Sequence, residues 1–245
     1  MKIIIKGAGG RMGKALSAII ENSEKHTVAA YCSMEFATDA AQNIYNNIHE
    51  FEGEADCIID FSNHLATADV IGYAVKKNLP IVVATTGQSE EELAIIKGAA
   101  DSIPVFYSQN MSLGVALLSC LAKIAAKAFP DADIEIVEKH HNQKLDVPSG
   151  TALLLAHRIQ EALTDTVLLV GRHENGKRTA KEIGIHSLRL GNEVGTHEII
   201  IATGAETITL KHEAENRSLF ANGALAAAKF LGGKAAGLYS MQDII

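Results

Sequence analysis

Two kinds of hydrophobic pattern alternate along the first 110 residues. Short runs rich in Ile, Val and Ala alternate with longer stretches in which apolar residues recur at helical spacing. The runs predict strands at residues 2–6, 28–31, 56–61, 80–84 and 104–107, and the longer stretches predict helices at 11–21, 64–77 and 89–100. Strands that are apolar throughout and alternate with helices predict a doubly wound parallel sheet covered on both faces.

The pattern changes after residue 112. A long apolar helix is expected at 113–129, a strand at 134–137 and, beyond a polar stretch, a second helix at 151–163. Strands follow between residues 184 and 211, with a hairpin turn at 203–206, and residues 220–231 form an Ala-rich helix that could pack on either part. This order predicts a second, α+β domain, in which a mixed or antiparallel sheet carries helices on one face.

Composition excludes several classes of protein. The chain has 22 Lys and Arg against 29 Asp and Glu, a net charge of -7, so a nucleic-acid partner is not expected. Its three cysteines form no C-x-x-C pair, which argues against a disulfide framework or a zinc ribbon. No apolar run reaches the ~18 residues of a membrane span. We expect a globular, cytoplasmic protein that neither binds nor crosses a membrane.

A glycine-rich turn follows the first strand and opens the first helix. Gly7, Gly9, Gly10 and Gly13 occur in the sequence GAGGRMG. Glycines here let the backbone approach a pyrophosphate, which the helix N–H groups attract. The literal G-x-G-x-x-G pattern fails because Met12 occupies its last position, so a plain glycine-rich turn is the alternative.

Two other segments lie where a doubly wound sheet presents ligands, at the carboxyl ends of strands. These are Phe61-Ser62 after the third strand and residues 84–87, ATTG, after the fourth. Small and hydroxylated residues there would let a nicotinamide or a ribose approach the backbone. The alternative, which the sequence favours equally, is that both segments are ordinary loops between a strand and a helix.

The densest chemistry lies between residues 135 and 152. His140, His141 and Lys144 are groups that can donate protons near neutral pH. Ser149 follows Pro148 as a plausible helix N-cap, and the N–H groups of the next two residues would then form an anion site. Lys144 beside that helix start would complete a corner for carboxylates.

Other interpretations of this region remain open. A zinc site is disfavoured because H-H-x-x-K lacks the i, i+4 histidine spacing, and a solvated polar loop is the plainest alternative. Glu138 could pair with Lys139 or orient a histidine. Isolated histidines are expected at the surface: His26, His49, His64, His157 and His173. Those in the strand region either line a cavity or are satisfied core residues: His186, His197 and His212.

Taken together, these motifs resemble the 4-hydroxy-tetrahydrodipicolinate (dihydrodipicolinate) reductase family of the diaminopimelate route to lysine. The most specific element is E-x-x-E-x-H-H-x-x-K-x-D-x-P-S-G-T-A at residues 135–152, with Val147 where Ala is usual. GAGGRMG, DFS at 60–62, ATTG at 84–87, QNMS at 109–112 and FANGA at 220–224 support it. The resemblance covers essentially the whole chain.

The resemblance implies two domains with separate tasks. Residues 1–111, joined by the C-terminal segment 217–245, would bind NADH or NADPH in a Rossmann-like domain. Residues 112–216 would bind the cyclic dicarboxylate and assemble a homotetramer through their sheet. The cofactor-binding residues implied are Gly7, Ala8, Gly9, Gly10, Arg11, Met12, Ala84, Thr85, Thr86, Ser108, Gln109, Asn110 and Met111.

The resemblance also assigns the chemistry. His140 would donate the proton with Lys144 as its partner, while the substrate carboxylates would be held by His141, Lys144, Gly150 and Thr151. The expected reaction is the reduction of 4-hydroxy-tetrahydrodipicolinate to tetrahydrodipicolinate. The rival functions are a dehydrogenase of similar plan that acts on an amino-acid semialdehyde, and a dinucleotide-sensing protein without catalysis.

Two positions depart from the family pattern. The second strand ends in Ser33, where an acidic or basic residue usually meets the adenosine ribose. Ser33 can hydrogen-bond to either dinucleotide but carries no charge, so use of both NADH and NADPH is expected. Thr196 stands where the family often has Glu, and the sequence offers no interpretation of it.

Overall fold

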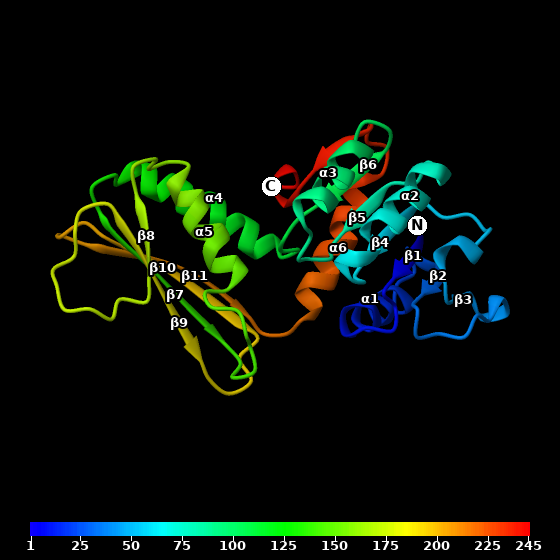
Figure 1. Cartoon of the computed structure of the whole chain (residues 1–245), viewed down its shortest axis with the longest axis horizontal. Helices are drawn as coiled ribbons and strands as arrows, with labels where there is room; N and C mark the ends of the chain where they lie inside the picture. Colours follow the sequence, from blue (N-terminus) through cyan, green and yellow to red (C-terminus); the bar gives the residue numbers. More distant parts are fainter. The chain divides into compact units, whose positions relative to one another are not determined.

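The predicted strand–helix alternation is present in the computed structural model, which describes residues 1–245. The chain divides into two compact units (Figure 1). The first contains residues 1–112 and 217–245, and the second contains residues 113–216.

The first unit is built on a seven-stranded sheet in the order β12-β6-β5-β4-β1-β2-β3, in which every neighbouring pair is parallel. Its strands are β1 (Lys2–Lys6), β2 (Thr27–Cys32), β3 (Ile44–Tyr45), β4 (Cys57–Asp60), β5 (Ile81–Val83), β6 (Pro104–Tyr107) and β12 (Gly237–Tyr239). Ile3, Ile4 and Ile5 are all fully buried. Consecutive residues of a strand point to opposite faces, so both faces of this sheet are covered. The predicted doubly wound fold is confirmed.

Four helices cover that sheet: α1 (Arg11–Glu21), α2 (Thr67–Lys77), α3 (Glu90–Ala99) and α6 (Ser218–Leu231). They pack in pairs, α1 with α6 and α2 with α3. Short 3-10 helices occur at Ala40–Gln42, Ile48–Glu50, His64–Ala66 and Met241–Asp243. β3 and β12 have only two and three residues, too few for a periodic pattern, and the sequence did not predict them.

Helix α6 belongs to the first unit, where it contacts α1, β4, β5 and β6. A Cβ atom at Gly223, within the FANGA motif, would lie only 1.7 Å from the carbonyl oxygen of Met111. The helix can therefore lie against the 108–112 loop only because this residue has no side chain.

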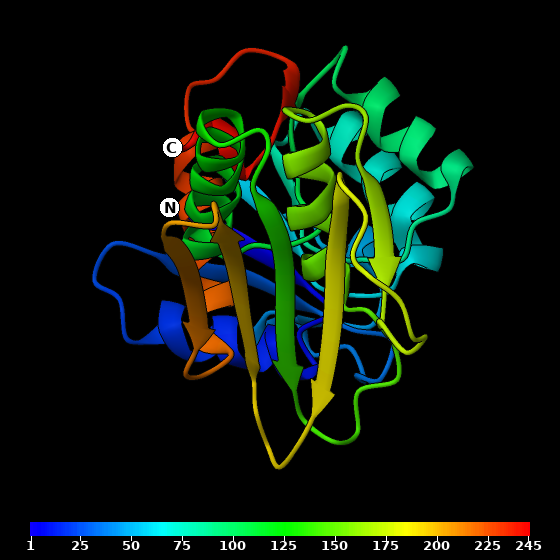
Figure 2. The same cartoon turned by 90° about the vertical axis from the view of Figure 1, so that its left-hand side faces the viewer.

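The second unit has a five-stranded sheet in the order β11-β10-β7-β9-β8. Its elements are α4 (Leu113–Ala128), β7 (Asp133–His140), α5 (Gly150–Gln160), β8 (Val167–Val170), β9 (Glu182–Arg189), β10 (Gly195–Ala202) and β11 (Thr207–Ala214). β7–β9 and β8–β9 are parallel, and the remaining pairs are antiparallel, so the sheet is mixed. Figure 2 shows it face-on with α4 and α5 together behind it.

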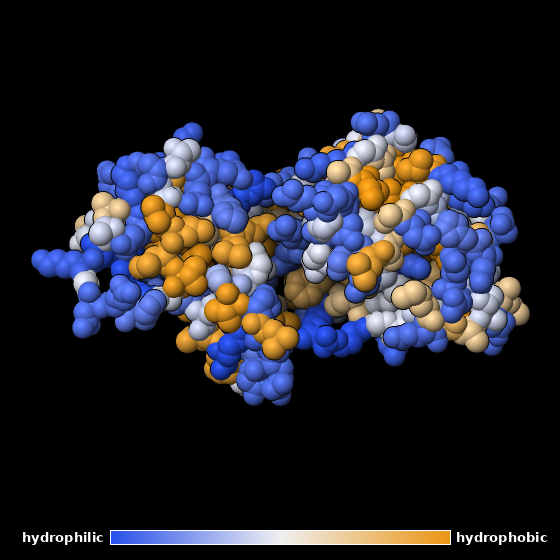
Figure 3. Space-filling view, in the orientation of Figure 1, coloured by the Kyte–Doolittle hydropathy of each residue, from blue (hydrophilic) through white to orange (hydrophobic).

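The helix-covered face of the second sheet forms this unit's core. Ile134, Ile136, Ile185 and Ile199 are fully buried and pack with α4 and α5. The surfaces of the two units are largely hydrophilic, with separate apolar patches (Figure 3). No helix is both long and apolar enough to cross a membrane.

Three details differ from the sequence analysis or complete it. β7 continues to His140 because Glu138 and His140 occupy the buried face in register with Ile134 and Ile136; their polarity had suggested a loop. His26 is not a surface residue: it is buried immediately before β2, near Lys229 of α6. The predicted turn at 203–206 is confirmed by a hydrogen bond from Thr203 N–H to the Glu206 carbonyl.

Two neighbouring leucines on α4 test this packing. Leu118 is 5% exposed and Leu117 is 48% exposed. Leu118→Ala leaves a cavity and should lower the free energy of unfolding by about 3 kcal/mol. Leu117→Ala, the matched control, should change it by less than about 0.5 kcal/mol. Urea denaturation of the full chain measures both, and equal losses would contradict the assigned helix face.

Candidate active site

The glycine turn of the first unit is closely packed. Gly7 has a φ of +80°, and a Cβ there would lie 2.6 Å from the carbonyl oxygen of Phe61. A Cβ at Gly13 would lie 2.2 Å from the carbonyl oxygen of Gly7. Gly10 is the N-cap of α1 and contributes no side chain, so no side chain caps the first N–H groups of the helix. Such a helix start suits a pyrophosphate.

The side chains at the end of β2 reach the same turn. A Cβ added to Gly9 would lie 2.9 Å from Ser33 Oγ and 3.0 Å from a carboxylate oxygen of Glu35. Ser33 is buried, whereas Glu35 is exposed and makes no ion pair. Glu35 therefore turns inward and brings negative charge close to the glycine turn.

One buried carboxylate joins the loops after β4 and β5. Asp60 Oδ1 accepts hydrogen bonds from Ser62 N–H (2.9 Å) and Ser62 Oγ (2.5 Å). Its Oδ2 accepts one from Thr85 Oγ1 at 3.1 Å. Burial raises the pKa of Asp60, and these hydrogen bonds oppose that rise. Asp60 thus fixes the two loops relative to each other, with Ala84 and Thr85 buried and Thr86 exposed.

The loop after β6 is held by its own hydrogen bonds. Ser108 Oγ donates to the carbonyl of Asn110 at 2.8 Å, and the Asn110 side chain accepts from Ser112 N–H at 2.8 Å. Met111 is buried next to α6, and Gln109 lies between these anchored residues. The predicted dinucleotide residues thus lie in the turn after β1, at the end of β2 and in the loops after β5 and β6.

In the second unit, the end of β7 carries a buried glutamate–histidine pair. Glu138 is fully buried, and its Oε2 lies 2.5 Å from Nδ1 of His140. Arg189, at the end of the neighbouring β9, donates to both carboxylate oxygens at 2.8 and 2.9 Å. Burial raises the pKa of Glu138, but the hydrogen bonds from His140 and Arg189 lower it by more, so the carboxyl is ionised.

The start of α5 is attached to this pair. Ser149 is the N-cap, as predicted, and its Oγ accepts from Ala152 N–H. Its own N–H donates to Glu138 Oε1 at 3.1 Å. Gly150 and Thr151 are the first two residues of the helix, at the positive end of its dipole.

His197 completes the cluster from β10. Its Nε2 lies 3.1 Å from Ser149 Oγ, and its ring meets the His140 ring edge-on at 5.2 Å between centroids. Burial, and then the charge of a protonated His140, lowers the pKa of His197 to about 3. This imidazole is neutral at physiological pH.

His141 and Lys144 lie just beyond the strand. His141 N–H donates to the Glu193 carbonyl, and Lys144 N–H donates to the His141 carbonyl, which forms a turn. Lys144 Nζ lies 2.7 Å from a carboxylate oxygen of Asp146. The lysine is thus held by a local partner.

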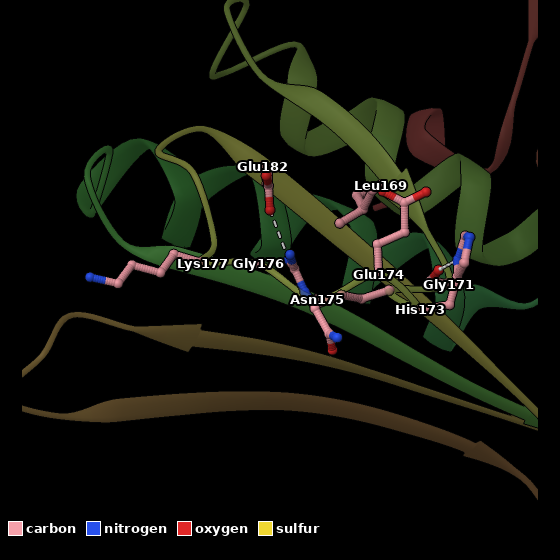
Figure 4. Close-up of a pocket in the computed structure, with 9 residues that line it drawn as sticks. Leu169, Gly171, His173, Glu174, Asn175, Gly176, Lys177 and Glu182 are labelled. Carbon is pink, nitrogen blue, oxygen red and sulfur yellow. Dashed lines mark hydrogen bonds and ion pairs between the residues drawn. The ribbon is translucent and has the colours of Figure 1, made fainter.

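A pocket of about 310 Å³ lies elsewhere in the second unit, in the connection from β8 to β9 (Figure 4). Residues 171–177 line it with Leu169 and Glu182, and Lys177 points away from it (Figure 4). It contains none of the predicted site residues. No group of three or more His, Cys, Asp or Glu side chains is arranged to hold a metal ion.

Comparisons with known proteins agree over the whole chain. A family model for the N-terminus of dihydrodipicolinate reductase matches residues 1–111, and one for its C-terminus matches residues 114–245. The chain belongs to the dihydrodipicolinate reductase family. The 4-hydroxy-tetrahydrodipicolinate reductases of Caldanaerobacter subterraneus subsp. tengcongensis and Clostridium novyi are 45% and 44% identical to it. Each match covers 100% of this chain and 98% of the relative.

A solved member of the family has the same fold. The dipicolinate-bound dihydrodipicolinate reductase from Paenisporosarcina sp. TG-14 superimposes with a TM-score of 0.81 and covers 100% of this chain and 99% of its own. Sequence identity is 23%, so this likeness concerns the fold alone. The predicted family and fold class are confirmed.

Two residues of this site in the reductase chain, Arg189 and Gly195, were not found from the sequence, and His197 was named there without a role, as a cavity or core residue. Arg189 lies 51 positions from Glu138, and His197 lies 48 positions from Ser149. Gly195 adjoins the His140 ring, since its Cβ would lie 3.0 Å from Nε2. Strand pairing brings all three residues to His140. For Arg189 and His197 the available signal was a polar side chain near the end of a strand, and Gly195 gave no such signal. Of the two alternatives left open for Glu138, orientation of a histidine is the one observed.

The low pKa of His197 predicts a pH dependence of stability. Unfolded His takes up a proton near pH 6.5, whereas buried His197 does so near pH 3, so its contribution is lost as pH falls from 6.5 to 3. Between pH 6.5 and 5, wild type should lose about 2 kcal/mol more than His197→Gln. Urea denaturation across this range measures the difference. The control is His157→Gln, which replaces an exposed histidine. If the free energy of unfolding of His197→Gln depended on pH as steeply as that of the wild type, the low pKa of His197 would be disproved.

Proposed function

We propose that the chain reduces 4-hydroxy-tetrahydrodipicolinate to tetrahydrodipicolinate with NADH or NADPH, as a step of diaminopimelate and lysine biosynthesis. Full-length identity of 45% to a 4-hydroxy-tetrahydrodipicolinate reductase carries this proposal. The geometry supports it, because a paired histidine and an anion-binding helix start share one buried carboxylate.

The first unit would hold the dinucleotide. The start of α1 and the close-packed glycines fit a pyrophosphate, with Gly7, Ala8, Gly9, Gly10, Arg11 and Met12 around it. The loops after β5 and β6 would border the nicotinamide and its ribose: Ala84, Thr85, Thr86, Ser108, Gln109, Asn110 and Met111. The bound nicotinamide supplies the hydride.

The second unit would hold the cyclic dicarboxylate and give the proton. The N–H groups of Gly150 and Thr151 favour a carboxylate, and Lys144 and His141 follow β7 to add positive charge and hydrogen bonds. His140, protonated on both nitrogens, would donate from Nε2 while Nδ1–H stays bonded to Glu138. The 4-hydroxyl group leaves the substrate ring as water, one hydride and one proton enter the ring, and the histidine is left neutral.

Two rival functions fit less well. A semialdehyde dehydrogenase would need a single carboxylate site, whereas this chain offers Lys144 as well as the α5 start. A dinucleotide sensor would not need an orienting carboxylate behind its histidine. A substrate screen separates the first rival, and turnover separates the second.

Two further proposals concern the assembly and the location of the protein. We propose a homotetramer formed through the open face of the second sheet, which carries partly buried charge pairs such as Lys139–Glu198. Light scattering of the purified protein would test the mass. A cytoplasmic location suits a biosynthetic reductase and the three free cysteines.

The proposed activity is measured by coupling the purified protein to the synthase that makes its substrate and following NADH and NADPH loss at about 340 nm. His140→Gln should lower kcat by ~10²–10⁴-fold because the general acid is gone. The dissociation constant of the dinucleotide should stay within about twofold, since His140 belongs to the other unit. Turnover of the variant at the wild-type rate would remove His140 from the mechanism, and no turnover in wild type would remove the function.

Cofactor choice gives a separate prediction. Ser33 carries no charge and Glu35, although turned toward Gly9, is exposed, so its repulsion of a 2′-phosphate is screened. We expect kcat/KM for NADH and NADPH within about tenfold, or ~1.4 kcal/mol. Ser33→Asp should shift preference toward NADH, and Glu35→Gln toward NADPH, in both kcat/KM and dissociation constants. A hundredfold preference of the wild type for either dinucleotide would show that residues other than Ser33 and Glu35 determine the choice of cofactor.

A further inference from the structure

We propose that Glu138, held by Arg189, is a positioning residue that keeps Nδ1 of His140 protonated and leaves Nε2, beside Gly195, as the nitrogen that gives and regains the proton. The inference rests on the proposed function for its chemistry. Its geometry is independent of the substrate.

Glu138 has its hydrogen-bonding capacity filled. An ionised carboxylate has about four acceptor sites. Oε2 receives His140 Nδ1 at 2.5 Å and Arg189 Nη1 at 2.9 Å, and Oε1 receives Arg189 Nη2 at 2.8 Å and Ser149 N–H at 3.1 Å. A carboxylate that already accepts from three other groups can only be an acceptor toward Nδ1, so Nδ1 must carry a proton.

Arg189 prevents the carboxylate from turning. Its bidentate contact fixes the plane of the Glu138 carboxylate. The same guanidinium donates to the backbone carbonyls of Asp146 and Leu188. The loop that follows β7 is thereby tied to the same arginine. Rotation of Glu138 would break four hydrogen bonds in a buried site, which makes the orientation of the His140 ring unusually well determined.

The other titratable groups around His140 do not compete for Nδ1. His197 approaches from β10 as a neutral ring directed at Ser149. His212, on β11, has a pKa lowered by burial. Lys144 is paired with Asp146 in the loop. Glu138 is thus the acceptor in direct contact with the imidazole.

The far side of the imidazole faces a glycine. A Cβ at Gly195 would lie 3.0 Å from Nε2 and 3.3 Å from Cδ2 of His140. Nε2 itself makes no hydrogen bond in the structure. A side chain at position 195 would crowd His140 Nε2, the nitrogen that must contact the substrate. Gly195 therefore leaves space for the substrate at Nε2.

Ser149 extends the effect of Glu138 to substrate binding. Its N–H is bonded to the carboxylate that orients His140, and the next two residues begin the proposed carboxylate site. One buried group therefore sets the distance between the proton donor and the anion site. Small misplacements between such groups cost large factors in rate.

The test removes the carboxylate without leaving a buried unpaired charge. Glu138→Leu with Arg189→Met replaces the ion pair by apolar side chains of similar size, which buried sites often tolerate. The control is Asp69→Asn, which breaks the exposed His49–Asp69 pair of the first unit. Glu138→Gln is the conservative single variant. The partners of both Glu138 carboxylate oxygens are hydrogen-bond donors, so the NH₂ group of the new amide must face donors in its turn.

Two readouts are needed for these variants. Nitrogen NMR of ¹⁵N-histidine-labelled protein, assigned with His140→Gln, should show Nδ1–H in neutral wild-type His140 and in the control. The double variant should show a mixture or Nε2–H. Its kcat should fall ~10²–10⁴-fold, as when an orienting carboxylate is lost, while the dinucleotide dissociation constant stays within about threefold.

Gly195→Ala tests access of the substrate to His140 Nε2 separately from the tautomer of His140. Its methyl group should lower kcat by roughly tenfold or more and leave Nδ1–H unchanged. An Nε2–H signal in wild type, an unchanged tautomer in the double variant, or kcat within about threefold of wild type in either Gly195→Ala or the double variant would overturn the proposal. Because the tautomer is read without turnover, a protein inactive on the substrate would refute the function and leave this test intact.

Discussion

The candidate active site of the second unit depends on the hydrogen bonding of one buried carboxylate. Glu138 accepts from His140 on its own strand, Arg189 on the next strand and Ser149 at the start of α5. Removing a buried carboxylate from water is costly, and these charged and backbone donors offset that cost. The same contacts place His140, the proposed proton donor, beside a helix N-terminus, so the interaction that makes the burial possible also builds the candidate site.

The first unit uses the geometry of a parallel sheet for the same purpose. The carboxyl ends of β1, β4 and β5 lie at one edge, where Asp60 ties Ser62 to Thr85 and the close contact of Gly7 with Phe61 joins the glycine turn to the next loop. α6, which comes from the far end of the sequence, closes this unit and approaches Met111 through Gly223. Motifs that lie far apart in the sequence are thus in contact in the fold, and this contact explains the small residues that they contain.

Much of this could be predicted, because local signals determined it. The apolar runs gave the parallel strands, Ser149 was recognisable as an N-cap, and the glycine turn and the His140–Lys144 segment were visible as motifs. Arg189 and Gly195 were not, and His197 was named without a role, since only strand register brings the three residues to His140. β7 was predicted too short because Glu138 and His140 are polar residues on a buried face, as functional sites often require. His26 was misplaced for a related reason: burial of an isolated polar side chain depends on packing that its neighbours in sequence do not reveal.

Transfer of hydrogen from cofactor to substrate is the central claim, and isotope labelling tests it most directly. The substrate would be generated in place and reduced with NADH carrying deuterium at nicotinamide C4, and the product analysed by mass spectrometry. The account predicts a tetrahydrodipicolinate that contains one deuterium when the transferred position is labelled, and at least ~10²-fold less of it with His140→Gln over the same time. Cofactor oxidation that leaves the cyclic dicarboxylate unlabelled and unchanged would contradict it.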